Sequence, residues 1–174
     1  MERKRKEREV VDDIIKRGGR VEYDFEIDVR SKPAGPDWLR GLLGENFFDE
    51  VYVVQLKTIC GPGFEQVKGM TFLKWVGLDK TEVADADLGF LKGLPDLQML
   101  DLNFTTAGDT GLVNLEELTE LRWLYLAHTS VTDAGLVHIR KLHRLHTLDL
   151  TGTRVTDAGT KNLREALPDV LIKR

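Results

Sequence analysis

The stretch LRWLYLAHTSVTDAGLVHIRKLHR (residues 121–144) is followed at once by a second copy of the same pattern, LHTLDLTGTRVTDAGTKNLREALP (residues 145–168). Two looser copies begin at Leu73 and Leu97, so the same phrase recurs every 24 residues. Leucines at positions 1, 4 and 6 of a repeat in the range of roughly 20–29 residues predict units that stack into a solenoid. One such unit cannot bury its apolar side alone, so neighbouring units must share a continuous core.

Each repeat divides into a strand, a turn and an outer helical segment. The pattern Leu-x-x-Leu-x-Leu predicts a strand whose leucines point into the core, such as Leu124 and Leu126. A threonine follows at position 9, where its hydroxyl is expected to bond backbone groups of the turn. A small apolar residue at position 11 is expected to complete the core, as Val131 does in the clearest copy, followed by Leu136 in the helical segment.

An aspartate occupies position 13 of each of these four copies, directly before the stretch expected to be helical. Aspartate is a preferred N-cap residue, because its carboxylate accepts hydrogen bonds from the first turn of a helix. We therefore interpret these aspartates as helix caps, and capping accounts for their spacing without a bound metal ion. They are Asp85, Asp109, Asp133 and Asp157.

Two regions follow from the extent of the repeats. Residues 1–46 are predicted to form an N-terminal cap, with a helix over residues 2–17, an amphipathic strand over residues 20–29 and a short helix after Asp37. Residues 47–174 hold about five repeats and a final short cap strand near residues 170–172. The first repeat is degenerate, because residues 60–63 replace the usual phrase; terminal repeats of solenoids are often atypical.

These repeats resemble those of bacterial leucine-rich repeat proteins abundant in planctomycetes, whose repeat reads LxxLxxLxLxxTxVTDAGL. The phrase VTDAGL is intact at residues 131–136 and nearly intact at residues 155–160. The resemblance covers roughly residues 51–172 and implies a short α/β solenoid. In that fold a parallel sheet forms the concave face and helices form the convex face, here with an α+β cap at the N-terminus. The resemblance describes a scaffold and implies no particular activity.

The composition excludes several classes of function. A formal net charge of −4 argues against a nucleic-acid-binding protein held by phosphate contacts. No run approaches the ~18 apolar residues that would predict a membrane span, and the basic N-terminus lacks the apolar core of a secretory signal. Cys60 is the only cysteine, so no internal disulfide can form, and we expect a reducing, cytoplasmic location.

No motif indicates an enzyme, a cofactor or a metal site. The chain contains no nucleophile elbow, P-loop or dinucleotide-binding fingerprint. Its four histidines fit no helical zinc-binding pair, and Cys60 is interpreted as a structural thiol. We therefore expect a non-enzymatic protein with no cofactor.

The concave face is where the sequence predicts binding. Positions 3 and 5 alternate with the buried leucines and must point out of the sheet. Trp75, Met99 and Trp123 share position 3 and predict an aromatic ridge, with Tyr125 beside it. Aromatic residues and methionine are enriched at interfaces, so we expect the ridge to bind a protein or peptide. Phe104 would extend the apolar patch toward one loop edge, and three aspartates would set the charge preference of the face: Asp79, Asp101 and Asp149.

Three other interpretations remain open, two for this face and one for the N-terminal cap. The ridge could join two copies of the chain in a homodimer, or its aromatic residues could pack on one another or on the cap and bind nothing. Alternatively, the chain could be a structural or assembly subunit that docks through its N-terminal cap. In that case the acidic side of the strand over residues 20–29 would be the contact: Glu22, Asp24, Glu26 and Asp28.

Overall fold

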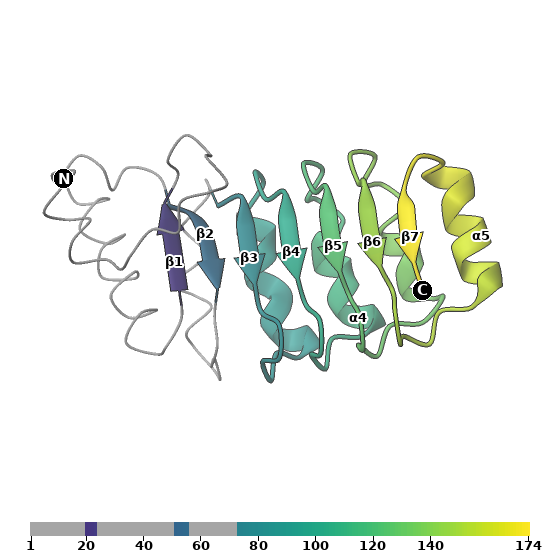
Figure 1. The fold of residues 1–174 in the computed structure, drawn as a ribbon, viewed down its shortest axis with the longest axis horizontal. Helices are drawn as coiled ribbons and strands as arrows, with labels where there is room; N and C mark the ends of the chain where they lie inside the picture. Colours follow the sequence, from purple (N-terminus) through teal and green to yellow (C-terminus); the bar gives the residue numbers. More distant parts are fainter. Residues whose placement is uncertain (1–19, 24–50, 56–72) are drawn as a thin grey trace, which may run out of the picture.

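The computed structural model describes residues 20–23, 51–55 and 73–174, which form one seven-stranded sheet in the order of the chain (Figure 1). From β2 onward every neighbouring pair of strands is parallel, and β1 pairs with β2 in the antiparallel sense. The strands are β1 (Arg20–Tyr23), β2 (Val51–Gln55), β3 (Trp75–Gly77), β4 (Met99–Asp101), β5 (Trp123–Tyr125), β6 (Thr147–Asp149) and β7 (Leu171–Lys173).

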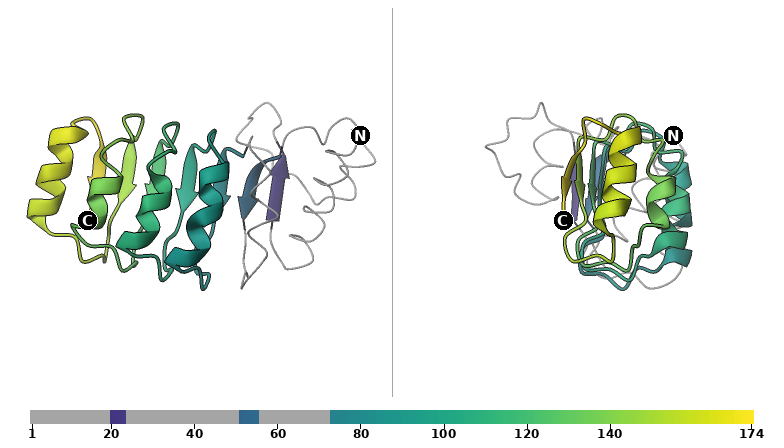
Figure 2. Two further views of the ribbon diagram at one scale, coloured as in Figure 1. Left: turned by 180° about the vertical axis from the view of Figure 1, so that it is seen from behind. Right: turned by 90° about the vertical axis from the view of Figure 1, so that its right-hand side faces the viewer.

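The helical segments of the described chain all lie on one side of the sheet (Figure 2). Only α5 (Asp157–Ala166) is an α-helix of ten residues. The others are short and mostly of the 3-10 type: η2 (Asp85–Gly93), α4 (Asp109–Leu112), η3 (Val113–Leu115) and η4 (Gly135–His138). Glycines within these segments disfavour a regular α-helix, and 3-10 turns are the usual form of such short connectors. Parallel strands on one face and helical segments on the other confirm the predicted short α/β leucine-rich-repeat solenoid.

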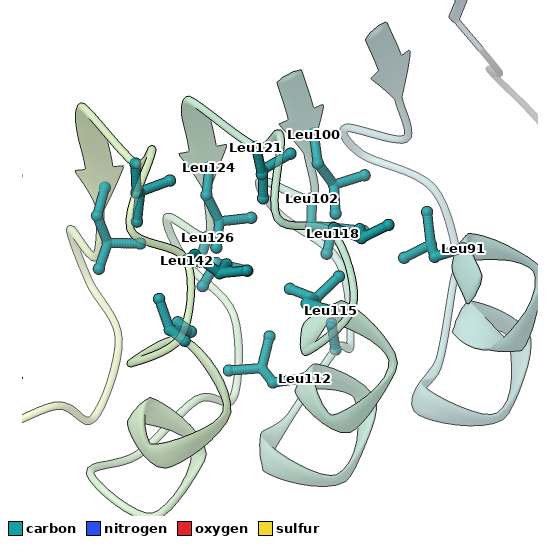
Figure 3. Packing of buried hydrophobic residues seen from close by; sticks show 14 of the residues in the cluster. Leu91, Leu100, Leu102, Leu112, Leu115, Leu118, Leu121, Leu124, Leu126 and Leu142 are labelled. Carbon is teal, nitrogen blue, oxygen red and sulfur yellow. The ribbon is translucent and has the colours of Figure 1, made fainter. Parts of the chain in front are cut away.

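The predicted repeat register is confirmed by the core. Leu124, Leu126 and Val131 have no solvent exposure and Leu136 is 3% exposed. Leucines from successive strands and from the helical segments meet in one continuous layer between the sheet and the helices (Figure 3). The threonine at position 9 closes each turn, because its hydroxyl donates to the carbonyl three residues earlier, as Thr129 does to Leu126 at 2.7 Å.

The aspartates at position 13 do not cap their own helices, so that prediction was wrong. The backbone N-cap of α4 is Gly108 and that of α5 is Thr156, whose hydroxyl accepts from the Gly159 N–H at 3.2 Å. Asp109 reaches the next repeat instead: its Oδ1 accepts from the Thr132 N–H at 2.8 Å and its Oδ2 from the Thr132 hydroxyl at 2.6 Å. We call this contact the Asp–Thr clamp.

The clamp recurs along the stack. Asp133 accepts from the Thr156 N–H at 2.7 Å and from its hydroxyl at 2.6 Å. These two hydrogen bonds hold the pKa of Asp133 below its usual value. In the repeat that begins at Leu73, Asp85 likewise reaches the next repeat, where it accepts from the Gly108 N–H at 2.6 Å. Three of the four aspartates therefore join successive repeats, whereas Asp157 of the last repeat pairs with Arg174. This role explains the 24-residue spacing as well as capping would.

In the three later repeats a glycine lies two residues after the aspartate, and it leaves room for the carboxylate of the preceding repeat. A Cβ atom on Gly135 would lie 2.4 Å from Asp109 Oδ1, and one on Gly159 would lie 2.1 Å from Asp133 Oδ1. A side chain larger than hydrogen at these positions would overlap the carboxylate that forms the clamp. The phrase Thr-Asp-Ala-Gly therefore encodes an interlocking surface between repeats, in addition to a local turn.

The predicted strand over residues 20–29 is described only as far as Tyr23, and that part is β1. Its pairing with β2 was not predicted, and the register shifts between Glu22 and Tyr23. The sheet thus continues across the predicted boundary between residues 46 and 47. The predicted helix over residues 2–17, residues 24–29, the short helix after Asp37 and the insertion at residues 60–63 lie outside the described residues.

Candidate functional site: the open face of the sheet

The face of the sheet opposite the helices is covered by no helix of the described residues (Figure 2), and we call it the open face. The register of β3 to β7 aligns one residue from each strand along this face. Because neighbouring strands lie about 4.8 Å apart, the aligned residues form a row about 19 Å long. We call this row the ridge, and its members are Trp75, Met99, Trp123, Thr147 and Leu171.

The large residues of the ridge are more covered than the sequence suggested. Trp75, Met99 and Trp123 are partly buried, although their alternation with the buried leucines predicted side chains that point out of the sheet into solvent. The Trp123 ring meets His146 edge-on, with centroids 6.5 Å apart and an interplanar angle of 76°. The indole Nε1 of Trp75 is inaccessible to solvent and has no hydrogen-bond partner among the described residues. The rings are therefore held against their neighbours and expose only part of their surface.

The far end of the ridge was missed by the sequence analysis. Leu171 is 61% exposed and pairs in register with Thr147. It lies one further 24-residue period beyond Thr147, so extending the repeat count by one would have placed it on the open face. Its exposure makes it the most accessible apolar side chain of the ridge.

A second row runs beside the ridge, two residues further along each strand. Asp101, Tyr125 and Asp149 are aligned by the register of β4, β5 and β6, and all three are partly buried. Asp101 Oδ1 accepts from the Asn103 N–H at 2.9 Å, and Asp149 Oδ1 accepts from the Thr151 N–H at 3.0 Å. Within the described part of the chain, neither carboxylate forms an ion pair. The row therefore places two carboxylates on either side of Tyr125, and Lys173 of β7 continues the row beside Asp149.

Asp101 carries the electrostatic cost of this arrangement. Burial raises its pKa above the usual value, and the nearby charges of Asp79 and Asp149 raise it further. The hydrogen bond from the Asn103 N–H and the charge of Lys80 act in the opposite direction. The three predicted aspartates are thus close enough for Asp101 to sense the charges of the other two.

We expect Asp101→Asn to stabilise the fold at neutral pH. The folded pKa of Asp101 lies above its unfolded value, so its charge opposes folding at neutral pH and this penalty disappears as pH falls through the folded pKa. Because the group is partly solvated, the rise in Tm should stay below the ~2–4 °C that about 1 kcal/mol produces in a domain of this size. Thermal melts of both proteins at pH 7 and at decreasing pH measure the difference. A less stable variant at pH 7 would contradict this account.

Phe104 lies at the loop edge of the open face and is 52% exposed. Its ring stacks on His128 at 4.5 Å with an interplanar angle of 16°, and Lys80 Nζ lies 5.9 Å from the ring centroid. All three residues have φ near +57° and share position 8 of their repeats with Gly152, whose φ is +70°. A column of left-handed residues therefore carries an exposed stack next to the strand ends, and Phe104 belongs to this stack and not to the ridge.

The described residues contain no group of three or more histidine, cysteine, aspartate or glutamate side chains placed to hold a metal ion. Among these residues there is also no helix long and apolar enough to cross a membrane. On the convex side His138 Nδ1 lies 2.6 Å from Glu116, which also pairs with Lys141 at 3.2 Å. These two contacts lower the pKa of Glu116.

The parallel sheet, the leucine core and the helices on one face define a leucine-rich-repeat fold. No protein-family model matches the chain, and no curated protein matches it either. Among solved structures, the internalin InlF of Listeria monocytogenes is similar at 21% identity and a TM-score of 0.54, over 62% of this chain and 30% of that one. This chain therefore corresponds to less than a third of the length of that internalin.

Two further solved structures are also similar. Internalin C2 of Listeria monocytogenes is 20% identical with a TM-score of 0.44, over 62% of this chain and 53% of that one. The Leptospira interrogans protein LIC12759 is 16% identical with a TM-score of 0.36, over 71% and 48%. At 21% identity, the likeness to the internalin InlF concerns the fold alone.

Proposed function

We propose that this protein is a non-enzymatic interaction module that binds a protein or peptide through the ridge and the adjacent Tyr125. The proposal rests on one observation: five consecutive strands align Trp75, Met99, Trp123, Thr147 and Leu171 on a face that no described helix covers. Tryptophan and tyrosine are the side chains that contribute most at interface hot spots.

Partial burial of the ridge supports this function. A ring already held against its neighbours loses little side-chain entropy when a partner covers its remaining surface. Trp123 is held by His146 in this way, and Leu171 offers an exposed apolar end. Trp123 is thus held in place for contact with a partner, and the register of the parallel strands fixes the line of the ridge.

We expect Trp123→Ser to weaken partner binding at least tenfold, which corresponds to about 1.4 kcal/mol. Its side chain lies outside the leucine core, so the change in stability should be small. Wild-type protein and the variant are used as baits, and the amount of each captured protein is quantified. Val137→Ser is the matched control, because Val137 is an exposed apolar residue (54%) on the helical side of the molecule.

The same variants separate the competing functions. Loss of a captured protein with Trp123→Ser but not with Val137→Ser supports the ridge. Equal capture by all three proteins contradicts it and favours docking through the N-terminal cap. If sedimentation shows a dimer that Trp123→Ser dissociates, with no heterologous partner lost, the ridge joins two copies of the chain.

A further inference from the structure

The electrostatics of the open face narrow the chemistry of its partner; this step rests on the proposed function. Asp101 and Asp149 lie two strands apart in the same row, which places them about 10 Å from each other. Each uses its Oδ1 atom to accept a backbone N–H of its own turn. The second oxygen of each carboxylate has no hydrogen-bond or ion-pair partner in the described part of the chain.

Lys80 acts on Asp101 through its charge and Lys173 is aligned with Asp149 on the next strand, but among the described residues neither lysine forms an ion pair with these carboxylates. Partly buried carboxylates without a bonded cation are unfavourable in the free protein, and a partner that supplies directly bonded cations relieves that cost. The opposite side of the ridge is different. There Lys74 is already paired with Asp96 at 3.3 Å, and Arg122 occupies the same position of a later repeat. The carboxylates that keep an oxygen without a hydrogen-bond partner are therefore those beside Tyr125, Asp101 and Asp149.

We propose that the segment bound by the open face is basic as well as apolar. Two arginine or lysine side chains lie on Asp101 and Asp149, one on each side of Tyr125, while an apolar side chain packs on Met99 and Trp123. Arginine suits this role best, because its planar guanidinium pairs with a carboxylate through two hydrogen bonds and stacks on aromatic rings. An acidic segment is rejected, because it would bring like charges together at the two aspartates.

A peptide array tests the inference without knowledge of the natural partner. The probes are 12-residue peptides rich in leucine and tryptophan, each printed in three versions that differ only in arginine, glutamine or glutamate at two positions. We expect the arginine versions to bind the wild-type protein at least tenfold more strongly than the glutamate versions. The preference should shrink as salt concentration rises, because exposed charges are screened.

Two sets of variants locate the source of the preference. Asp101→Asn combined with Asp149→Asn should bring the ratio of binding of the arginine peptides to binding of the glutamate peptides close to one. Asp101→Lys combined with Asp149→Lys should invert this ratio. The control combines Glu117→Gln with Glu165→Gln, which removes the same charge from two exposed residues on the helical side and should leave the ratio unchanged. Circular dichroism verifies that each variant is folded.

Each result decides the inference. Equal binding of the three peptide versions overturns the inference, because the open face then shows no preference for basic peptides. A preference for arginine that the two asparagine substitutions and the two glutamine substitutions reduce equally also overturns it, because binding then follows the net charge of the protein alone. If Trp123→Ser reduces binding of all versions in such a case, the proposed function stands and only the basic partner is rejected. If Trp123→Ser leaves every signal unchanged, or no peptide binds, the proposed function and this inference both fail.

Discussion

Leu126→Ala is expected to lower the free energy of unfolding by about 2–5 kcal/mol, the range measured for leucine truncation in well-packed cores. Leu126 has no solvent exposure and follows β5 in the central part of the described stack. The equivalent leucines of the two neighbouring repeats, Leu102 and Leu150, are equally buried. The cavity would therefore lie between three repeats and has little freedom to collapse (Figure 3).

Urea unfolding followed by circular dichroism measures this loss. Val137→Ala is the control, because the exposed Val137 side chain should change stability by less than about 0.5 kcal/mol. Since each repeat contacts only its neighbours, the m-value should also be inspected for loss of cooperativity. A loss of less than about 1 kcal/mol for Leu126→Ala would show that the repeat interface repacks easily, against the expectation from complete burial.

Gly135→Ala is expected to destabilise the protein by about 1–3 kcal/mol, the usual cost of overpacking a closely packed site. Helix propensity alone predicts the opposite sign, because alanine is favoured over glycine within helices. The new Cβ would lie 2.4 Å from Asp109 Oδ1, 3.0 Å from Leu112 Cδ1 and 3.2 Å from the Asp109 Cα. Asp109 cannot move away without breaking its two bonds to Thr132.

Gly89→Ala is the matched control, because Gly89 is an exposed glycine of η2 and a Cβ atom added there would meet no other atom within 4 Å. It should be neutral or stabilising by up to about 1 kcal/mol. A double-mutant cycle of Asp109→Ala with Gly135→Ala adds a direct test of the clamp. The pair should cost at least about 0.5 kcal/mol less than the sum of the single changes, because the carboxylate is removed. Additive effects would mean that the overlap with the carboxylate does not cause the instability.

The 24-residue period determined most of the fold from sequence. It located the strands, separated core leucines from outward residues by alternation, and brought Trp75, Met99 and Trp123 into one row. These inferences succeed because each depends on local geometry that is repeated four times, and a side chain that alternates along a strand has only two faces to choose between.

The aspartate of the repeat shows where this reasoning stops. An N-cap within one repeat and a clamp to the next recur with the same period, so the spacing of Asp109 and Asp133 could not distinguish them. The choice is made by contacts between residues 23 positions apart, where Thr132 and Thr156 present an N–H and a hydroxyl together. The same stacking explains why the following glycines are needed.

Tertiary structure also decided how much of the ridge is open. The sequence placed Trp123 on the correct face but contained no measure of the space around it, which His146 and the neighbouring repeats fill. The pairing of β1 with β2 and the end of the ridge at Leu171 likewise arise from the sheet as a whole. Period and alternation determine which way a side chain points, whereas its exposure and partners depend on the side chains that packing brings around it.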